Sequence, residues 1–251
     1  MNRRTVILAL LMLVLGLGPA PAQTQKKVNK IYIVTCGIAD YPGYDMDLAL
    51  CANDAKTIKQ VFEKNKKASC ILLTNSQVTK AAVLNAMRTQ FAKATKNDAI
   101  LFFYSGHGAP GQLVFYDGLI EYKDIKNIMA KSKAGSKMIF ADACFSGKMR
   151  NEQRTNHNTS VPANLRNTEV MFFLSSRSDE TSIERPSMKN GFFTAYLQRG
   201  LRGGADANRD RTITARELFN FVSQGVKKIS NDKQHPVMWG KFKHNMPVIS
   251  W

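Results

Sequence analysis

Short apolar runs alternate along the chain with longer segments in which apolar residues recur every three or four positions. The short runs are typical of buried strands and the longer pattern of amphipathic helices. A turn at Asp117-Gly118 predicts a hairpin over 113–122. The strands are predicted at 31–36, 70–73, 99–104, 138–141, 170–174 and 237–239, and the helices at 48–63, 79–94, 122–131, 192–201 and 215–228.

This order of strands and helices defines the expected architecture. Strands that alternate with helices are typical of a mostly parallel sheet with helices on both faces, an α/β fold. The sequence contains no internal repeat and no second hydrophobic domain, so we predict one domain over 30–251, preceded by a short linker at 23–29. A polar, basic stretch at 148–167 separates two of the predicted strands and is interpreted as a flexible loop.

The first residues have a different pattern. Arg3 and Arg4 precede an apolar run at 6–17, and Ala20-Pro21-Ala22 supplies the small residues of a cleavage site. We interpret 1–22 as a signal peptide, which implies an exported protein, either periplasmic or extracellular. The alternative is a membrane anchor, but the run falls short of the roughly 20 apolar residues that a spanning helix needs.

Charge and cysteine content narrow the class further. The chain has 251 residues and a formal net charge of +17, yet its lysines are scattered, which is typical of a solvated basic surface. No base-reading motif is present, so no specific nucleic-acid partner is expected. An even number of cysteines in an exported protein suggests disulfides, although a chain of this size folds without them. Cys36 and Cys70 are either small buried hydrophobic residues or the partners of a Cys36–Cys70 bridge.

Two of the apolar runs lead to residues with catalytic potential, His107 and Cys144. The carboxyl ends of parallel strands share one sheet edge, so the two residues are expected to meet there. An imidazole lowers the pKa of a neighbouring thiol or takes its proton during attack. Main-chain N–H groups of Gly108 and Cys144 are candidates for an oxyanion hole. The alternative is a histidine in a tight turn and an inert buried cysteine.

The segments around these residues resemble a known family. Tyr104-Ser-Gly-His-Gly108 and Asp142-Ala-Cys-Phe-Ser-Gly147 are similar to the catalytic motifs of caspase-like cysteine peptidases of the bacterial metacaspase or orthocaspase type, with support from 51–55 and 191–197. The resemblance implies a caspase-like three-layer sandwich. It also implies that His107 is the general base and Cys144 the nucleophile of a thioester mechanism that needs no cofactor.

The same resemblance suggests the substrate. It implies that Asp54, Ser105 and Asp142 line the pocket for the residue before the cleaved bond. Two carboxylates in one cleft repel each other unless a cation lies between them, so peptide or protein substrates with Arg or Lys at the cleavage site are expected. The alternative for Asp54 is an acid on a helix surface. For the whole chain, the alternatives are a catalytically silent caspase-fold regulatory or binding domain, or a protease of the clostripain or gingipain type.

Two further segments carry functional hypotheses. The loop at 148–167 contains Lys148, Arg150, Arg154 and Arg166, and it is either cut by the enzyme itself or never cleaved. The segment 206–217 places oxygen side chains at the spacing of an EF-hand calcium loop, with Arg211 where glycine is usual. The alternative there is a polar turn that caps the next helix. The Ca²⁺ ligands of that hypothesis are Asp206, Asn208, Asp210, Thr212 and Glu217.

Overall fold

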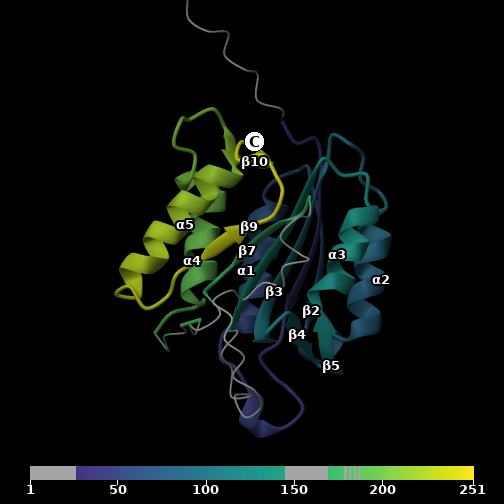
Figure 1. Cartoon of the computed structure of the whole chain (residues 1–251), viewed down its shortest axis with the longest axis vertical. Coiled ribbons are helices and arrows are strands. Elements are labelled where there is room, and N and C mark those ends of the chain that lie inside the picture. Colours follow the sequence, from purple (N-terminus) through teal and green to yellow (C-terminus); the bar gives the residue numbers. More distant parts are fainter. Residues whose placement is uncertain (1–26, 145–168, 178–179, 181, 184, 186) are drawn as a thin grey trace, which may run out of the picture.

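The computed structural model describes residues 27–144, 169–177, 180, 182–183, 185 and 187–251. Its centre is a sheet with the strand order β2-β1-β3-β6-β7-β9, flanked by helices on both faces (Figure 1). All neighbouring strands on this path are parallel except β7 and β9. The predicted signal peptide at 1–22 and the basic loop at 148–167 lie outside the described residues and stay predictions.

The described elements follow the predicted order. The strands are β1 Ile31–Gly37, β2 Ala68–Thr74, β3 Ala99–Ala109, β4 Gln112–Phe115, β5 Gly118–Glu121, β6 Ser136–Cys144, β7 Met171–Leu174, β8 Thr212–Thr214, β9 Val237–Trp239 and β10 Pro247–Ser250. The α-helices are α1 Cys51–Glu63, α2 Lys80–Phe91, α3 Tyr122–Lys131, α4 Phe192–Arg199 and α5 Ala215–Ile229. Short 3-10 turns at Tyr44–Met46 and Asn75–Gln77 and a π-helical turn at Gly200–Gly204 complete the chain.

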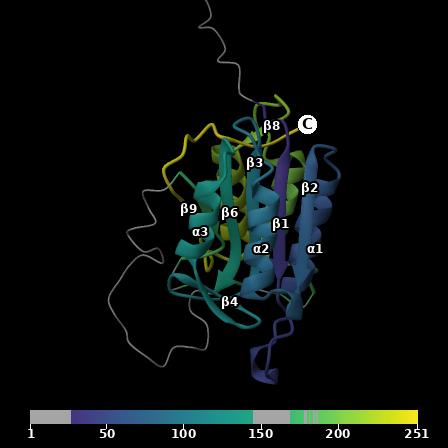
Figure 2. The same ribbon diagram turned by 90° about the vertical axis from the view of Figure 1, so that its right-hand side faces the viewer.

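Alternate residues of the central strands build two separate hydrophobic cores. Phe102 and Ile139 face the core beneath α2 and α3, whereas Phe103 and Phe140 face the core beneath α1, α4 and α5. This alternation is expected for extended chains buried on both sides, because successive side chains point to opposite faces. Figure 2 shows the strands between the two helix layers, with β1 and β6 running in the same direction. The predicted three-layer sandwich is confirmed.

Two predicted strands are longer than the hydrophobic pattern indicated. β3 continues to Ala109 and β6 to Cys144, well past the last residues of their apolar runs. Main-chain pairing between them continues through Ser105, which lies opposite Asp142, although both side chains are polar. Hydrophobicity marks the buried core of a strand, whereas pairing ends only where the main chain separates. The prediction that both strands stop before the histidine and the cysteine is therefore wrong.

Three smaller features complete the comparison with the sequence. The hairpin is confirmed as β4 and β5, with Phe115 opposite Gly118. A second sheet, formed by β8 and β10, was missed because each strand is very short. Cys36 and Cys70 lie on neighbouring strands and both are free thiols, so the Cys36–Cys70 bridge is wrong. Within the described residues, none of the helices is long and apolar enough to cross a membrane.

Candidate active site

The carboxyl edge of the parallel sheet, at the bottom of Figure 1, brings the predicted catalytic residues together. His107 and Cys144 are register partners at the paired ends of β3 and β6. Two residues earlier, Ser105 and Asp142 are partners in the same ladder. Neighbouring strands lie about 4.8 Å apart, so the register places the backbones of the histidine and the cysteine side by side.

The imidazole of His107 is held by a main-chain carbonyl. Its Nε2 lies 2.6 Å from the carbonyl oxygen of Met46, in the loop that follows β1. A carbonyl oxygen can only accept, so Nε2 carries the proton in this hydrogen bond. In a neutral imidazole the lone pair then resides on Nδ1, which is the tautomer that a general base needs. The half-buried His107 is thus oriented with Nε2 bound to the Met46 carbonyl, and its Nδ1 is the nitrogen that can accept a proton.

Asp54 lies in the first turn of α1 and is 1% exposed. Its Oδ2 accepts from the Ser105 hydroxyl at 2.9 Å, and its Oδ1 accepts from the Asn190 amide at 2.8 Å and from the Gly191 N–H at 3.2 Å. The alternative of a helix-surface acid is therefore wrong. Three donors from two other elements fix this carboxyl beside β3.

Asp142 has a comparable set of donors. Its Oδ2 accepts from the Thr194 hydroxyl at 2.7 Å and from the Thr194 N–H at 3.2 Å, and its Oδ1 accepts from the Ser182 hydroxyl. The side chain is 5% exposed. Gly191 separates the two acids: a Cβ there would lie 2.9 Å from Oδ2 of Asp142 and 3.5 Å from Oδ2 of Asp54. The absence of that atom leaves room beside both carboxyls.

Burial changes the acidity of this pair. Desolvation raises the pKa of Asp54 well above its usual range, and the nearby charge of Asp142 raises it further. Desolvation also raises the pKa of Asp142, against the hydrogen bonds from Ser182 and Thr194. Two adjacent acids in a low dielectric ionise together only with difficulty. A cation beside the two carboxyls would favour their ionised forms, and the two negative charges would bind that cation strongly.

Asp54, Ser105 and Asp142 therefore lie together next to the register pair of His107 and Cys144, and their role as the lining of a substrate pocket stays a prediction. Sequence reasoning missed the residues that form hydrogen bonds with these acids and with His107. Thr194 and Gly191 belong to the 191–197 motif and carried a signal, whereas Met46 acts through its main chain and carried none. The missed contributors are Met46, Ser182, Asn190, Gly191 and Thr194.

The segment 206–217 uses its oxygen atoms locally. The side chains of Asp206 and Asn208 accept hydrogen bonds from the main-chain N–H groups of Asp210 and Arg211. Glu217 forms a capping box with Thr214 at the start of α5. Arg211 adopts a left-handed φ of 67°, the conformation for which the EF-hand normally uses glycine. Among the described residues, no group of three His, Cys, Asp or Glu side chains is placed to hold a metal ion. Calcium binding by Asp206, Asn208, Asp210, Thr212 and Glu217 stays a prediction.

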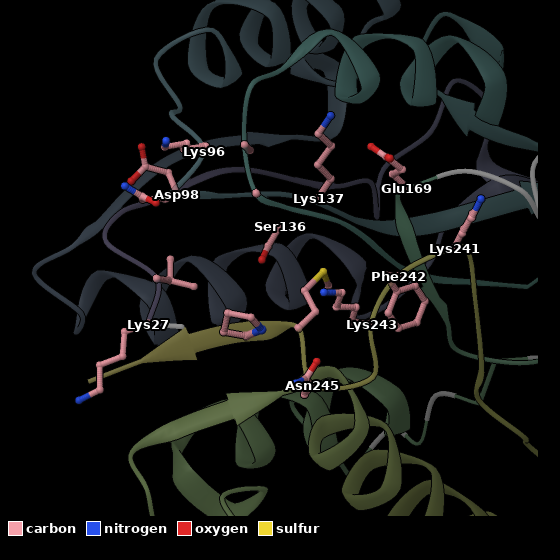
Figure 3. Close-up of a pocket in the computed structure, with 16 residues that line it drawn as sticks. Lys27, Lys96, Asp98, Ser136, Lys137, Glu169, Lys241, Phe242, Lys243 and Asn245 are labelled. Carbon is pink, nitrogen blue, oxygen red and sulfur yellow. The ribbon is translucent and has the colours of Figure 1, made fainter. Parts of the chain in front are cut away.

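A cavity of about 510 Å³ lies at the opposite, amino edge of the sheet. Lysines line it, but Figure 3 shows Lys27 and Lys137 extending in different directions. The ammonium of Lys137 donates to the carbonyl of Ala130 at 3.1 Å. The cavity is therefore not a convergent anion site, and it is far from the catalytic pair along the strands.

The arrangement defines a class of protein. An α/β sandwich that pairs a histidine with a cysteine at the carboxyl edge of its parallel strands has the layout of a cysteine peptidase. The chain belongs to the caspase domain family, whose model matches residues 32–246. The family resemblance inferred from the motifs is confirmed, and the chain carries a caspase domain that is similar in sequence to metacaspases.

Individual relatives agree with this assignment. Metacaspase-1A of Neurospora crassa is 36% identical over 88 residues, which cover 32% of this chain and 19% of the relative. Metacaspase-1A of Aspergillus terreus is also 36% identical over 88 residues, which cover 32% of this chain and 21% of that relative. The match thus spans about a fifth of these relatives. Among solved structures, Caspase-1 of Spodoptera frugiperda superposes with a TM-score of 0.67 at 14% identity, covering 92% of this chain and 94% of that one. Protein GSU0716 of Geobacter sulfurreducens gives 0.63 at 15% identity, covering 85% and 95%.

Proposed function

We propose that this peptidase is an exported endopeptidase that hydrolyses peptide bonds after Arg or Lys, with Cys144 as nucleophile and His107 as general base. The observation that carries the proposal is the register of β3 and β6. It pairs His107 with Cys144 and, two residues earlier, Ser105 with Asp142. A reacting centre and a buried acidic pocket are thereby adjacent along the same two strands.

The proposed reaction proceeds in two steps. The Cys144 thiol transfers its proton to Nδ1 of His107, and the thiolate attacks the carbonyl carbon of the substrate. The carbon–nitrogen bond then breaks, the imidazolium gives its proton to the leaving amine, and a thioester remains on Cys144. Water, deprotonated by His107, hydrolyses the thioester and restores the thiol. The N–H groups of Gly108 and Cys144 are proposed to stabilise the oxyanion.

Specificity rests on the Asp54–Asp142 pair. Each carboxyl already accepts three hydrogen bonds from the protein, so the pair is held in place without a ligand. A guanidinium or ammonium group entering beside Gly191 would face two acids whose pKa values are raised chiefly by desolvation, and its positive charge would favour their ionised forms. An acidic substrate side chain would meet like charge in a low dielectric, which costs several kcal/mol.

Two parts of the proposal rest on sequence alone. Export depends on the signal-peptide pattern at 1–22, and self-cleavage depends on the basic residues of 148–167. Amino-terminal sequencing of protein recovered outside the cytoplasm tests the first, with Gln23 as the expected first residue. Intact-mass comparison of the wild type with Cys144→Ala tests the second, and identical masses would contradict self-cleavage.

Fluorogenic peptides ending in Arg, Lys or Asp test the main proposal, in the presence of a reductant and with or without Ca²⁺. We expect cleavage of the Arg and Lys peptides and none of the Asp peptide. Cleavage confined to Asp would overturn the pocket assignment. Absence of cleavage from all three would favour a silent binding domain instead.

A further inference from the structure

The main chain of His107 lies between two strand pairings of β3, the one with β1 and the one with β4. β1 pairs with β3 only as far as Gly37 opposite Ser105, and the last main-chain bond between them joins Ile38 N–H to the Ser105 carbonyl at 3.0 Å. β3 nevertheless continues to Ala109. On its other side, β6 still pairs at His107. β4 pairs with β3 only from Gly108, so the histidine lies in the interval between the end of the β1 pairing and the start of the β4 pairing.

A buried tyrosine binds the main chain in this interval. The N–H of His107 donates to the hydroxyl of Tyr41 at 2.8 Å. The Tyr41 ring lies against the imidazole, with ring centroids 4.8 Å apart and an interplanar angle of 46°. Tyr41 is 5% exposed, so water does not compete for this contact. One side chain therefore contacts both the backbone and the ring of the histidine.

A second tyrosine completes the clamp. The hydroxyls of Tyr41 and Tyr104 are 3.1 Å apart, and that of Tyr104 lies 2.9 Å from the carbonyl oxygen of His107. The N–H of His107 thus donates to the Tyr41 hydroxyl, while the Tyr104 hydroxyl lies within hydrogen-bond distance of the His107 carbonyl and also, at 2.6 Å, of the Val114 carbonyl in β4. A Cβ on Gly106 would come within 3.0 Å of both hydroxyls, so only glycine fits before the histidine.

Tyr41 is itself fixed by the loop that carries it. Its N–H donates to Oδ1 of Asp47 at 2.9 Å, and the N–H of Leu48 donates to the Ala39 carbonyl at 2.8 Å. The same loop supplies the Met46 carbonyl that binds Nε2 of the imidazole. The loop that carries Tyr41 and Met46 therefore contacts both the main chain and the ring of His107, and it fixes the tautomer of the imidazole.

We propose that Tyr41 is a positioning residue of the peptidase, which holds His107 at the angle required to take the proton of Cys144. This inference rests on the proposed catalytic pair but not on the proposed Arg/Lys specificity. A displaced base loses rate without losing substrate affinity, and small displacements of catalytic groups cost up to about a hundredfold.

Tyr41→Phe tests the role because it keeps the ring and removes only the oxygen that accepts from His107. We expect kcat to fall by about tenfold or more with KM unchanged. We also expect the rate of Cys144 alkylation by iodoacetamide, followed by peptide mass spectrometry, to shift its pH profile to higher pH. That profile reports the thiol–imidazole pair without any substrate, so it separates failure of this inference from failure of the specificity proposal.

Tyr122→Phe is the matched control, because Tyr122 is also a fully buried tyrosine but lies at the start of α3, packed edge-on against Phe172. We expect it to leave kcat and the alkylation profile as in the wild type. If Tyr41→Phe changes only the melting temperature, Tyr41 is merely structural and the inference is wrong. If Tyr41→Phe does not fold, Tyr104→Phe decides, since an unchanged alkylation profile there would equally overturn the clamp.

Discussion

Both ends of the parallel sheet bury aspartate, in contrasting surroundings. At the amino edge, Asp98 is 6% exposed and accepts from the Lys30 N–H at 3.0 Å and from the N–H and hydroxyl of Thr95, both at 2.8 Å. Its own carbonyl accepts from Gly135 and Ser136. Asp98 thereby joins the starts of β1, β3 and β6. At the carboxyl edge, Asp54 and Asp142 are equally buried and equally hydrogen-bonded, but they lie beside each other.

The two ends of the sheet differ in whether hydrogen bonds from the protein are enough to stabilise the buried carboxyls. Donors from Lys30 and Thr95 satisfy the Asp98 carboxyl, so its role is to hold the chain. Donors also fix Asp54 and Asp142, but they do not remove the repulsion between two charges in a low dielectric. A buried acid thus indicates structure when its charge is balanced locally, and indicates a ligand when a like charge accompanies it.

Removal of the catalytic groups should separate the two ends most strongly. We expect Cys144→Ala and His107→Ala to lower kcat/KM on Arg and Lys peptides by about a thousandfold or more, because each removes half of the reacting pair. Lys243→Ala, in the amino-edge cavity, should leave kcat/KM within about twofold of the wild type, because surface changes away from a site have small effects. Steady-state kinetics on the three proteins check this, and strong loss in Lys243→Ala would mean that the cavity takes part in catalysis.

The aspartates themselves give the next largest contrast. Asp142→Asn should lower kcat/KM for Arg peptides by roughly a hundredfold, since loss of one partner of a buried charge pair costs about 2–5 kcal/mol. Asp98→Asn should instead keep kcat/KM and lose about 1–3 kcal/mol of folding stability, the cost of leaving buried donors unsatisfied. Peptide kinetics and urea unfolding measured on both variants distinguish the roles. Equal kinetic losses would show that the two ends do not differ as argued.

The sequence predicted the layers and the meeting of His107 with Cys144 at one sheet edge, because both depend on local patterns. Apolar runs mark the buried strands, and the parallel order of those strands places His107 near Cys144. The extensions of β3 and β6 were missed because their last residues are polar yet still paired. Hydrophobicity and pairing coincide along most of these strands and diverge at this edge, where paired residues such as Ser105, Asp142 and His107 are polar.

The donors that surround the acids were harder to predict. Ser182 and Asn190 reach Asp142 and Asp54 from positions 40 and 136 residues away in the chain. Such contacts depend on how α4 and its preceding segment fold back onto the sheet, which no local pattern specifies. The role of Met46 could not be predicted from its residue type, because any residue supplies the same carbonyl.

The pH dependence of stability should sharpen the comparison further. The folded state raises the pKa of both Asp54 and Asp142 and so binds more protons than the unfolded chain, whose aspartates titrate near about 3.9. The free energy of unfolding contributed by this pair therefore falls as pH rises above about 4 and through the folded pKa values. In a Cys144→Ala background, which prevents self-cleavage, we expect this decline in urea titrations. Asp54→Asn should flatten it and Asp98→Asn should not, whereas a rise in stability over the same range would contradict the raised pKa values.

The smallest expected effect concerns the start of α5. Thr214 accepts from the Glu217 N–H at 3.3 Å, and the Glu217 carboxylate accepts from the Thr214 N–H at 3.0 Å and from its hydroxyl at 2.7 Å. Loss of such a cap in Thr214→Ala should cost about 1 kcal/mol of stability with kcat and KM unchanged, because the α5 cap does not contact the catalytic pair or its acids. Thermal unfolding with and without Ca²⁺ measures this, and the comparison also tests the calcium hypothesis. If Glu217 served chiefly as a calcium ligand, Ca²⁺ would raise the melting temperature of the wild type. A Ca²⁺-independent melting temperature, together with the expected loss in Thr214→Ala, would identify Glu217 as a capping residue, whose effect stays at the helix it begins.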